Sequence, residues 1–345
     1  PGFNKELVAS AYPHIGLFKT NRSNLPSKAA IIGAPKDKLL EIQKKVLSDV
    51  PKGELPISKM GGPYAQNALP DAADTYTIFF ETVTDKNIDD VIDSLKKFSI
   101  NQIILHHYGH YTQGDFKFEK SKFPGTMSDF KKIIDKFHSE GIKVGLQTYS
   151  FFLVWNSSYV TPVPHKDLDI LKTFTLKENI SADDKYIFVK ESTDGVTPDE
   201  GFIFVNSPYL WIDDELVKFT KADNGRFEIS ERGALGTTPA NHFANTDIKQ
   251  LKEYFLIPLA KAGSELFYEI ARNTAKFYNE CGADFFYLDA LDGAFVLDGE
   301  DYVWYHAVDF INEMFKYIEG DIIFDCCYNP SYTGSWFVRS RYGAI

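Results

Sequence analysis

Two aspartates each end an apolar run that is typical of a buried strand. Asp289 follows residues 285–288, and Asp325 follows residues 322–324. Side chains alternate along a strand, so Tyr287 and Asp289 should share one face. A carboxylate there is costly to bury unless it is paired or functional, and two carboxylates on neighbouring strand ends suit glycoside hydrolysis, one as nucleophile or base and one as acid. The alternatives are a loop cap for Asp289, and an ion pair or a sugar-hydroxyl ligand for Asp325.

A second polar group follows the strand predicted at 100–105. Residues 106–111 read His-His-Tyr-Gly-His-Tyr. Strand alternation places His106 and its neighbour on opposite faces, so they do not bind one ion together, and no metal site is predicted. We expect hydrogen bonds to sugar hydroxyls from His106, Tyr108 and His110, and from Tyr149 after the next strand. A His/Tyr pair that moves a proton, as lyases of uronic-acid glycans use, is the alternative.

Further substrate contacts are expected near other strand ends. Asp292 is either a turn residue or a second polar partner of the substrate. Trp336 offers a flat ring for a sugar, unless it packs in the core. Arg339 and Arg341 can hold a carboxylate, either of a neighbouring aspartate or of a substrate uronate. Together with Tyr287, these residues complete the predicted binding site.

Strand-like runs alternate with amphipathic helices along most of the chain. The strand candidates are 76–83, 100–105, 142–148, 283–288 and 321–324. Helices between them show apolar residues three and four apart, and one is predicted to begin at Asn87, another near Ser128. Such alternation predicts parallel strands joined by right-handed crossovers. A (β/α)8 barrel is favoured over an open doubly wound sheet, because no glycine-rich phosphate loop follows the first strand and polar residues gather at strand ends.

Two stretches fall outside this repeat. Residues 151–245 follow the third strand and form a β-rich insertion, which as a βα loop belongs to the face of Asp289. Its short strand candidates are 186–189, 201–205, 216–220 and 226–229. Residues 1–65 are an N-terminal bridging segment with a helix predicted at 38–50. The barrel itself comprises residues 66–150 and 246–345. Five strands are recognisable, with a sixth at 336–339, where a closed barrel has eight, so the barrel is expected to be incomplete at its C-terminus.

Composition excludes several classes of function. Of 345 residues, 44% are hydrophobic and 25% charged, the mix of a folded protein. The net charge of −11, without a basic cluster, argues against a nucleic-acid partner. No apolar run approaches the roughly 20 residues of a membrane span. The cysteines, at 281, 326 and 327, are expected to be buried thiols, with a vicinal disulfide as the alternative. Nothing implies a cofactor or indicates an oligomeric state.

Two parts of the chain resemble known carbohydrate-active enzymes. Residues 126–148 resemble the helix–glycine–strand unit of alpha-galactosidase-like barrels, in which an aspartate nucleophile ends the fourth strand. Asp289 occupies that place, while Tyr287 stands where the family has a lysine. Residues 212–217 and 231–237, with His242, resemble a small β-module inserted into large bacterial polysaccharide-degrading barrels. The resemblance covers roughly residues 70–345 and implies a polysaccharide-degrading enzyme with an extracellular or periplasmic location.

Three functions are compatible with these observations. The first is a retaining glycoside hydrolase with Asp289 as nucleophile and Asp325 as its partner. The second is a polysaccharide lyase, in which His106 or Tyr108 abstracts the proton beside a uronate and an arginine neutralises its carboxylate. The acidic charge of the chain argues mildly against such a polyanionic substrate. The third is a non-catalytic barrel that binds a glycan through its aromatic side chains.

Overall fold

The computed structural model describes residues 34–49, 77–80, 82–299, 302–327 and 338–342. The chain divides into two units, Pro1–Gln43 and Lys44–Ile345. A short 3-10 helix, η2 (Lys36–Lys38), leads into helix α1 (Leu39–Ser48). This helix confirms the one predicted at 38–50, whereas the rest of the predicted bridging segment lies outside the described residues.

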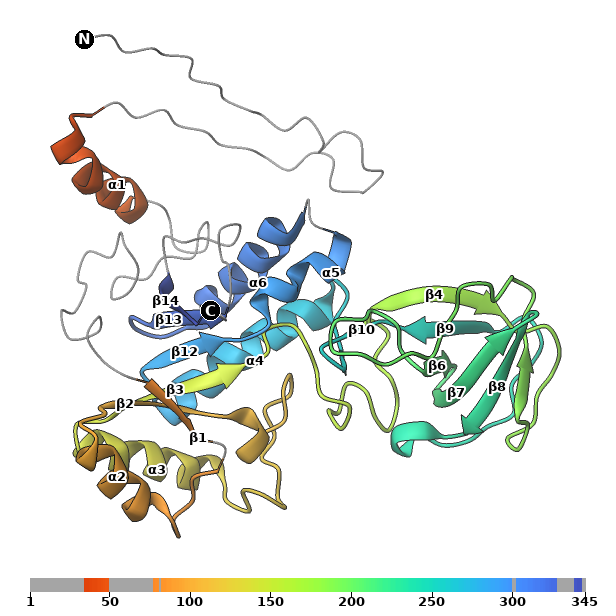
Figure 1. The fold of residues 1–345 in the computed structure, drawn as a ribbon, viewed down its shortest axis with the longest axis horizontal. Coiled ribbons are helices and arrows are strands. Elements are labelled where there is room, and N and C mark those ends of the chain that lie inside the picture. Colours follow the sequence, from red (N-terminus) through yellow and green to blue (C-terminus); the bar gives the residue numbers. More distant parts are fainter. Residues whose placement is uncertain (1–33, 50–76, 81, 300–301, 328–337, 343–345) are drawn as a thin grey trace. The chain divides into compact units, whose positions relative to one another are not determined.

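Six parallel strands form a sheet in the second unit (Figure 1). Across the sheet they are β1 (Thr77–Phe80), β2 (Gln102–Leu105), β3 (Lys143–Thr148), β12 (Phe285–Leu288), β13 (Ile323–Cys327) and β14 (Val338–Tyr342). Every neighbouring pair is parallel, and the order across the sheet is the order along the chain. A doubly wound sheet reverses its order at a switch point, and the strands described here do not. The predicted α/β class with a parallel sheet is confirmed, while a complete eight-stranded barrel stays a prediction.

Helices pack on one face of this sheet. The longer ones are α2 (Ile88–Lys97), α3 (Met127–Ser139), α4 (Glu265–Cys281) and α6 (Val303–Tyr317). Their buried side chains share one core cluster with strand residues such as Leu146 and Leu288. The alternate strand residues form a separate buried cluster, made of Ile104, Phe285, Tyr287 and Ile323. Because successive strand side chains point to opposite faces, this second cluster marks the face turned away from the helices.

Local sequence signals fix the ends of these helices. Thr126 caps α3 in a reciprocal capping box with Asp129, two residues before the predicted start. Gly282 ends α4 with φ 77°, a left-handed conformation that favours glycine, as predicted. Asn87 stands at the N-cap of α2, but its side chain does not cap that helix. Instead, Asn87 Oδ1 accepts a hydrogen bond from the Thr84 N–H at 2.7 Å.

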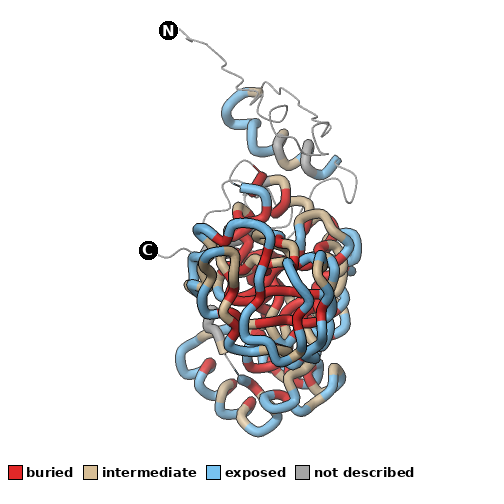
Figure 2. The backbone as a smooth tube through the Cα atoms, turned by 90° about the vertical axis from the view of Figure 1, so that its right-hand side faces the viewer, coloured by how far each residue is buried: buried red, intermediate tan, exposed pale blue. Residues whose placement is uncertain are grey.

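An antiparallel sheet lies between β3 and α4 in the chain, within residues 170–251, which we call the antiparallel lobe. In sheet order its strands are β4 (Ile170–Thr175), β9 (Asp247–Leu251), β6 (Tyr209–Ile212), β7 (Glu215–Asp223), β8 (Arg226–Glu231) and β5 (Tyr186–Phe188). The lobe has its own buried cluster, which includes Phe219 and Phe227, and buried backbone runs through its interior in Figure 2. Strands predicted at 186–189, 216–220 and 226–229 are confirmed. The prediction at 201–205 is wrong, because that segment forms no strand.

Short elements join the lobe to the parallel sheet. A two-stranded ladder, β10 (Glu253–Tyr254) with β11 (Ile257–Pro258), follows the lobe, and the β10 backbone bonds to the 202–205 segment. After β12 come the 3-10 helix η6 (Leu291–Ala294) and the short helix α5 (Phe295–Asp298). None of the described helices combines the length and apolarity needed to cross a membrane. Cys281 is a buried free thiol, and Cys326 is buried as well.

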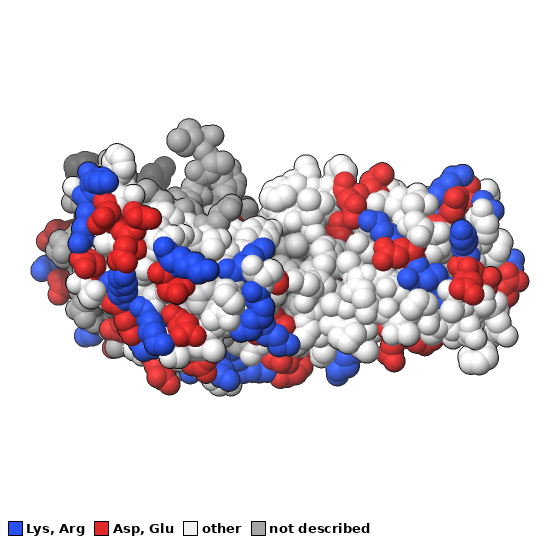
Figure 3. Space-filling view, turned by 90° about the horizontal axis from the view of Figure 1, so that it is seen from below, with Lys and Arg blue, Asp and Glu red and all other residues white. Residues whose placement is uncertain are grey.

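Charges of both signs mingle on the surface near α2 and α3 (Figure 3). Ion pairs there include Lys131–Asp135 at 2.8 Å and Lys132–Asp129 at 3.0 Å. Such exposed pairs contribute little to stability. The view shows no large area of positive charge, which agrees with the absence of a basic cluster in the sequence.

Candidate active site

Asp289 lies directly after β12 and is partly exposed. Its backbone is held by two bonds, from its own N–H to the Thr148 carbonyl at 2.8 Å and from Ser150 Oγ to its carbonyl at 3.0 Å. Both carboxylate oxygens accept hydrogen bonds: Oδ2 from Gln147 Nε2 at 2.5 Å, and Oδ1 from the Ala290 N–H at 2.9 Å. The contact with Ala290 is the one expected if Asp289 only caps the following loop. The contact with Gln147 orients the carboxylate from the neighbouring strand.

Gln147 belongs to a row of residues in register across the sheet. It pairs with Tyr287, and Tyr287 pairs with Asp325. In a parallel sheet, residues in register share a face, and Tyr287 belongs to the cluster on the face turned away from the helices. Gln147, Tyr287 and Asp325 therefore line that face near the carboxyl ends of the strands. Sequence analysis missed Gln147, although a polar residue inside a buried strand was a signal for it.

Asp325 differs from Asp289 in depth. Its side chain is fully buried, at 0% exposure, and it stands opposite Tyr287 rather than opposite Asp289. The catalytic prediction for Asp325 is not tested by this geometry. A proton donor must reach the glycosidic oxygen, so a catalytic role for Asp325 stays a prediction.

Four rings meet where β2 and β3 end, and we call them the ring cluster: His106, His107, Tyr108 and Tyr149. The His107 ring lies 4.2 Å from that of Tyr108 and 4.5 Å from that of Tyr149, measured between centroids. Tyr108 is half-exposed, at 48%. The structure thus brings together three of the residues predicted to bind sugar, and it adds His107.

The expected separation of His106 and His107 is wrong. Their rings stack at 4.8 Å with an interplanar angle of 21°. Strand geometry ends at Leu105, and the 3-10 helix η4 (His107–Gly109) turns the second ring back over the first. His106 Nδ1 also accepts a hydrogen bond from the Tyr108 N–H at 3.2 Å, which closes this turn.

His107 is a neutral imidazole beside Gln147. Burial and the adjacent His106 lower the pKa of His107 to about 3, and the Gln147 side chain opposes them only in part. Neither His107 ring nitrogen, nor Gln147 Oε1, makes a hydrogen bond of full geometry. The lowered pKa favours the neutral form of His107, which is the member of the ring cluster that contacts the amide holding Asp289.

His110 has a structural role. It is fully buried, and its Nδ1 lies 2.9 Å from the His106 carbonyl oxygen. Its Nε2 lies 3.1 Å from the backbone nitrogen and 3.1 Å from the carbonyl oxygen of Val83. Nε2 thus anchors the loop after β1 and Nδ1 anchors the turn after β2, so both ring nitrogens are engaged by backbone groups.

The remaining predicted residues are placed only in part. Asp292 lies in η6, and Arg339 and Arg341 lie in β14, but the structure describes only their backbone. Trp336 lies outside the described residues. Their predicted sugar contacts stay predictions. Within the described ranges, no group of three or more His, Cys, Asp or Glu side chains is arranged to hold a metal ion.

A cleft of about 470 Å³ opens beside the ring cluster. One side carries His107, Tyr108 and the loop that follows η4. The other side carries Trp155 and residues 255–257, close to both ends of the antiparallel lobe. His107, which lines the cleft, contacts the Gln147 side chain, and that side chain donates to Asp289.

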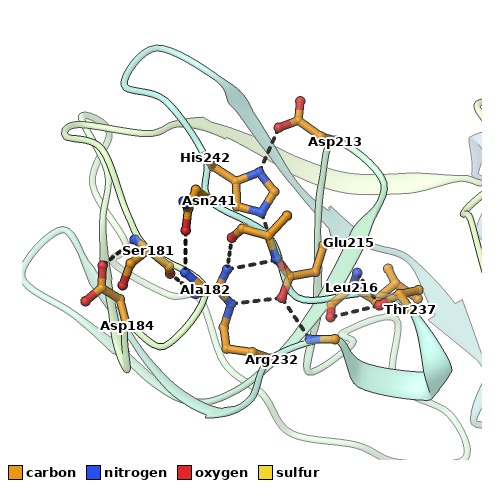
Figure 4. A network of polar contacts seen from close by, with 12 residues as sticks. Ser181, Ala182, Asp184, Asp213, Glu215, Leu216, Arg232, Thr237, Asn241 and His242 are labelled. Carbon is orange, nitrogen blue, oxygen red and sulfur yellow. Dashed lines mark hydrogen bonds and ion pairs between the residues drawn. The ribbon is translucent and has the colours of Figure 1, made fainter.

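The antiparallel lobe holds a second polar cluster around Glu215 and His242 (Figure 4). The His242 ring lies 2.7 Å from Asp213 Oδ2 through Nδ1 and 2.8 Å from Glu215 Oε2 through Nε2. Arg232 donates two bonds of 2.8 Å to Glu215, which also accepts from the N–H groups of Gly233 and Ala240.

In this cluster, hydrogen bonds and ion pairs offset the effect of burial on the charged groups. Burial alone raises the pKa of Glu215, but hydrogen bonds from His242 and Arg232 lower it to about 2. Burial alone lowers the pKa of His242, but its hydrogen bonds to Glu215 and Asp213 raise it. Donors and carboxylates satisfy one another, so we assign this cluster to the stability of the lobe. These residues carry the second sequence resemblance.

Comparison with known proteins finds only distant similarities, to solved structures and over part of the chain. No family model matches the chain, and no curated protein matches it. A trehalose-6-phosphate hydrolase from Bacillus licheniformis is 15% identical with a TM-score of 0.44, over 75% of this chain and 45% of that one. A trehalulose synthase mutant is 12% identical with a TM-score of 0.45, over 79% and 49%.

A mutant isomaltulose synthase from Erwinia rhapontici, in complex with sucrose, is 14% identical with a TM-score of 0.42, over 75% of this chain and 45% of that one. The chain thus spans about half the length of these structures. None of the three is an alpha-galactosidase-like enzyme, so that narrower resemblance gains no support from them. What the chain shares with these enzymes is a distant likeness of fold.

Proposed function

We propose that this protein is a carbohydrate-active enzyme, a retaining glycoside hydrolase whose nucleophile is Asp289. The observation that carries the proposal is the position of this carboxylate. It stands at the carboxyl end of a parallel strand, partly exposed and oriented by Gln147 from the next strand. Active sites of barrel enzymes lie at that end of the strands. An extracellular or periplasmic location, from the sequence resemblance, belongs to the same proposal.

The geometry suits a carboxylate that attacks a sugar carbon. Two donated hydrogen bonds hold the charged form of Asp289 in one orientation. In a retaining mechanism the nucleophile forms a covalent glycosyl-enzyme intermediate that water then hydrolyses. The second carboxyl group should lie roughly 5–5.5 Å away in a retaining enzyme and 6.5–9.5 Å away in an inverting one. Because Asp325 is buried, we leave the acid unassigned.

The variant Asp289→Asn tests this role while the fold is kept. The asparagine oxygen can still accept from the Ala290 N–H, and a rotated Gln147 amide can offer Oε1 to the new NH2 group. We expect turnover of aryl glycosides and oligosaccharides to fall by at least about 10³-fold with substrate binding retained. Asp183→Asn, at an exposed position of the lobe, is the matched control and should keep full activity.

Two outcomes would redirect the proposal. Full activity of a folded Asp289→Asn protein would leave Asp289 as a loop cap, a role that asparagine fills nearly as well. An unsaturated uronate product, detected by its ultraviolet absorbance, would favour the lyase alternative with His106 or Tyr108 as base. The contacts described here do not favour the loop cap or the lyase over the hydrolase.

A further inference from the structure

The cleft beside the ring cluster has walls from two separate segments. The loop after β2 supplies Tyr108 and Glu119, and the segments around the antiparallel lobe supply Trp155, Asn156, Phe202 and Phe255. These segments are tied together by Asn156 Nδ2, which donates to Glu119 Oε2 at 3.0 Å. The cleft therefore exists as a formed site between two elements.

Aromatic rings stand on both sides of this cleft. Tyr108 is 48% exposed and Phe202 is 62% exposed. The Phe202 ring packs on Phe255 at 4.9 Å, and the Phe255 N–H donates to the Phe202 carbonyl at 2.9 Å. Trp155 is held by its Nε1, which donates to the Leu256 carbonyl at 2.9 Å. The rings are thus fixed in place before any ligand binds, which lowers the entropic cost of binding.

Charge in the cleft is balanced. Among its lining residues, Glu119 and Lys122 are the ionised ones, and the buried His107 is neutral. A site for a carboxylated sugar would be expected to carry a surplus of positive charge, commonly an arginine. The exposed Phe202 ring, and the half-exposed Tyr108 ring with Lys122 Nζ 5.8 Å from its centroid, line the cleft together with a carboxylate and an amide. Such a lining suits a ligand with apolar C–H faces and uncharged hydroxyl groups.

We propose that this cleft is a subsite for an uncharged hexose unit of the glycan, with Tyr108 and Phe202 as its two ring platforms. The inference rests on the proposed function for the class of ligand. His107 lines the cleft and contacts Gln147, and Gln147 donates a hydrogen bond to Asp289, so the proposal places the cleft next to the reacting carboxylate. The unit in the cleft is a neighbour of the one that reacts, and the enzyme therefore acts on neutral glycans of at least two units.

Direct binding measurements test this subsite without turnover. Glucose, galactose and mannose are titrated against the whole protein by calorimetry, each beside its hexuronate. We expect at least one neutral hexose to bind, and to bind about 10-fold more weakly to Tyr108→Ala and to Phe202→Ala. Ile203→Ala is the matched control, because Ile203 is 67% exposed beside Phe202 and does not line the cleft. It should bind as the unaltered protein does.

Three results would overturn the inference: no neutral hexose binds, both ring variants bind with unchanged affinity, or a hexuronate binds more tightly than its hexose. Circular dichroism of each variant confirms that it is folded. The Asp289 experiment is independent of these titrations. If a hexose binds in the cleft and the Asp289→Asn protein stays active, the nucleophile assignment is refuted and the subsite is kept. If no hexose binds and the Asp289→Asn protein is inactive, the subsite is refuted and the nucleophile assignment is kept.

Discussion

The carboxyl group of Glu253 is buried without a well-formed hydrogen bond. Its side chain is 1% exposed, and neither carboxyl oxygen makes a hydrogen bond of full geometry. Burial raises the pKa of Glu253 from 4.5 to about 7; a contact with Ser207 and the charge of Lys218 oppose this rise, while the charge of Glu200 adds to it. At about 1.4 kcal/mol per tenfold change in proton affinity, this corresponds to roughly 3 kcal/mol between the two protonation states.

The sign of the pH dependence follows from where each state loses its proton. The unfolded chain releases the Glu253 proton near pH 4.5, and the folded protein releases it near pH 7. Between these values the unfolded state binds fewer protons, so the free energy of unfolding falls as the pH rises. The variant Glu253→Gln cannot ionise. We therefore expect it to lack this fall and to be more stable than the unaltered protein at pH 8, by up to about 3 kcal/mol.

Urea denaturation, followed by tryptophan fluorescence from pH 4 to pH 8, measures both proteins. Glu200→Gln is the control, because the Glu200 carboxylate lies nearby but is 46% exposed. This variant should keep most of the pH dependence. An unchanged fall in stability between pH 4.5 and 7 in Glu253→Gln would show that Glu253 is not the group responsible, and the reasoning from burial would fail.

Two further predictions concern a packed glycine in the parallel sheet and the His242 ion pairs in the antiparallel lobe. Gly145→Ala should destabilise the protein by roughly 1–3 kcal/mol in thermal denaturation, because the added Cβ would lie 2.2 Å from the Phe285 ring; a variant of unchanged stability would contradict the packing described for the sheet face. His242→Gln should cost roughly 3 kcal/mol below pH 6.5 and progressively less above it, because the raised pKa of His242 confines its ion pairs to lower pH. Equal losses at pH 6 and pH 9 in urea denaturation would count against a charged His242.

Hydrophobic patterning was sufficient to predict the parallel strands. In β2, β3 and β12 almost every residue is buried and most residues are apolar, as expected for strands covered on both faces. In the lobe the pattern was less informative: β4 has mixed burial, and its strand character depends on pairing with β9, more than 70 residues away in the sequence. The apolar segment 201–205 failed for the opposite reason, since its two Phe rings are exposed rather than buried in a sheet.

The candidate site was predictable in its strand-end residues and not in its connections. Asp289 was found because a carboxylate after a buried run is conspicuous. Gln147 and His107 were not found, because their importance lies in contacts across strands and in the turn that follows Leu105. The structural role of His110 was not predictable, because its Nε2 meets backbone groups of a distant loop at Val83, which no local pattern encodes.

The nucleophile assignment is tested most directly by trapping the intermediate. The protein is incubated with a 2-deoxy-2-fluoro glycoside of a sugar that it cleaves, carrying a good leaving group, and its intact mass is measured before and after peptide digestion. We predict a mass increase of one fluoroglycosyl group, located on the peptide that contains Asp289 and absent from Asp289→Asn. A label on a different carboxylate, or full turnover without any label, would contradict the assignment.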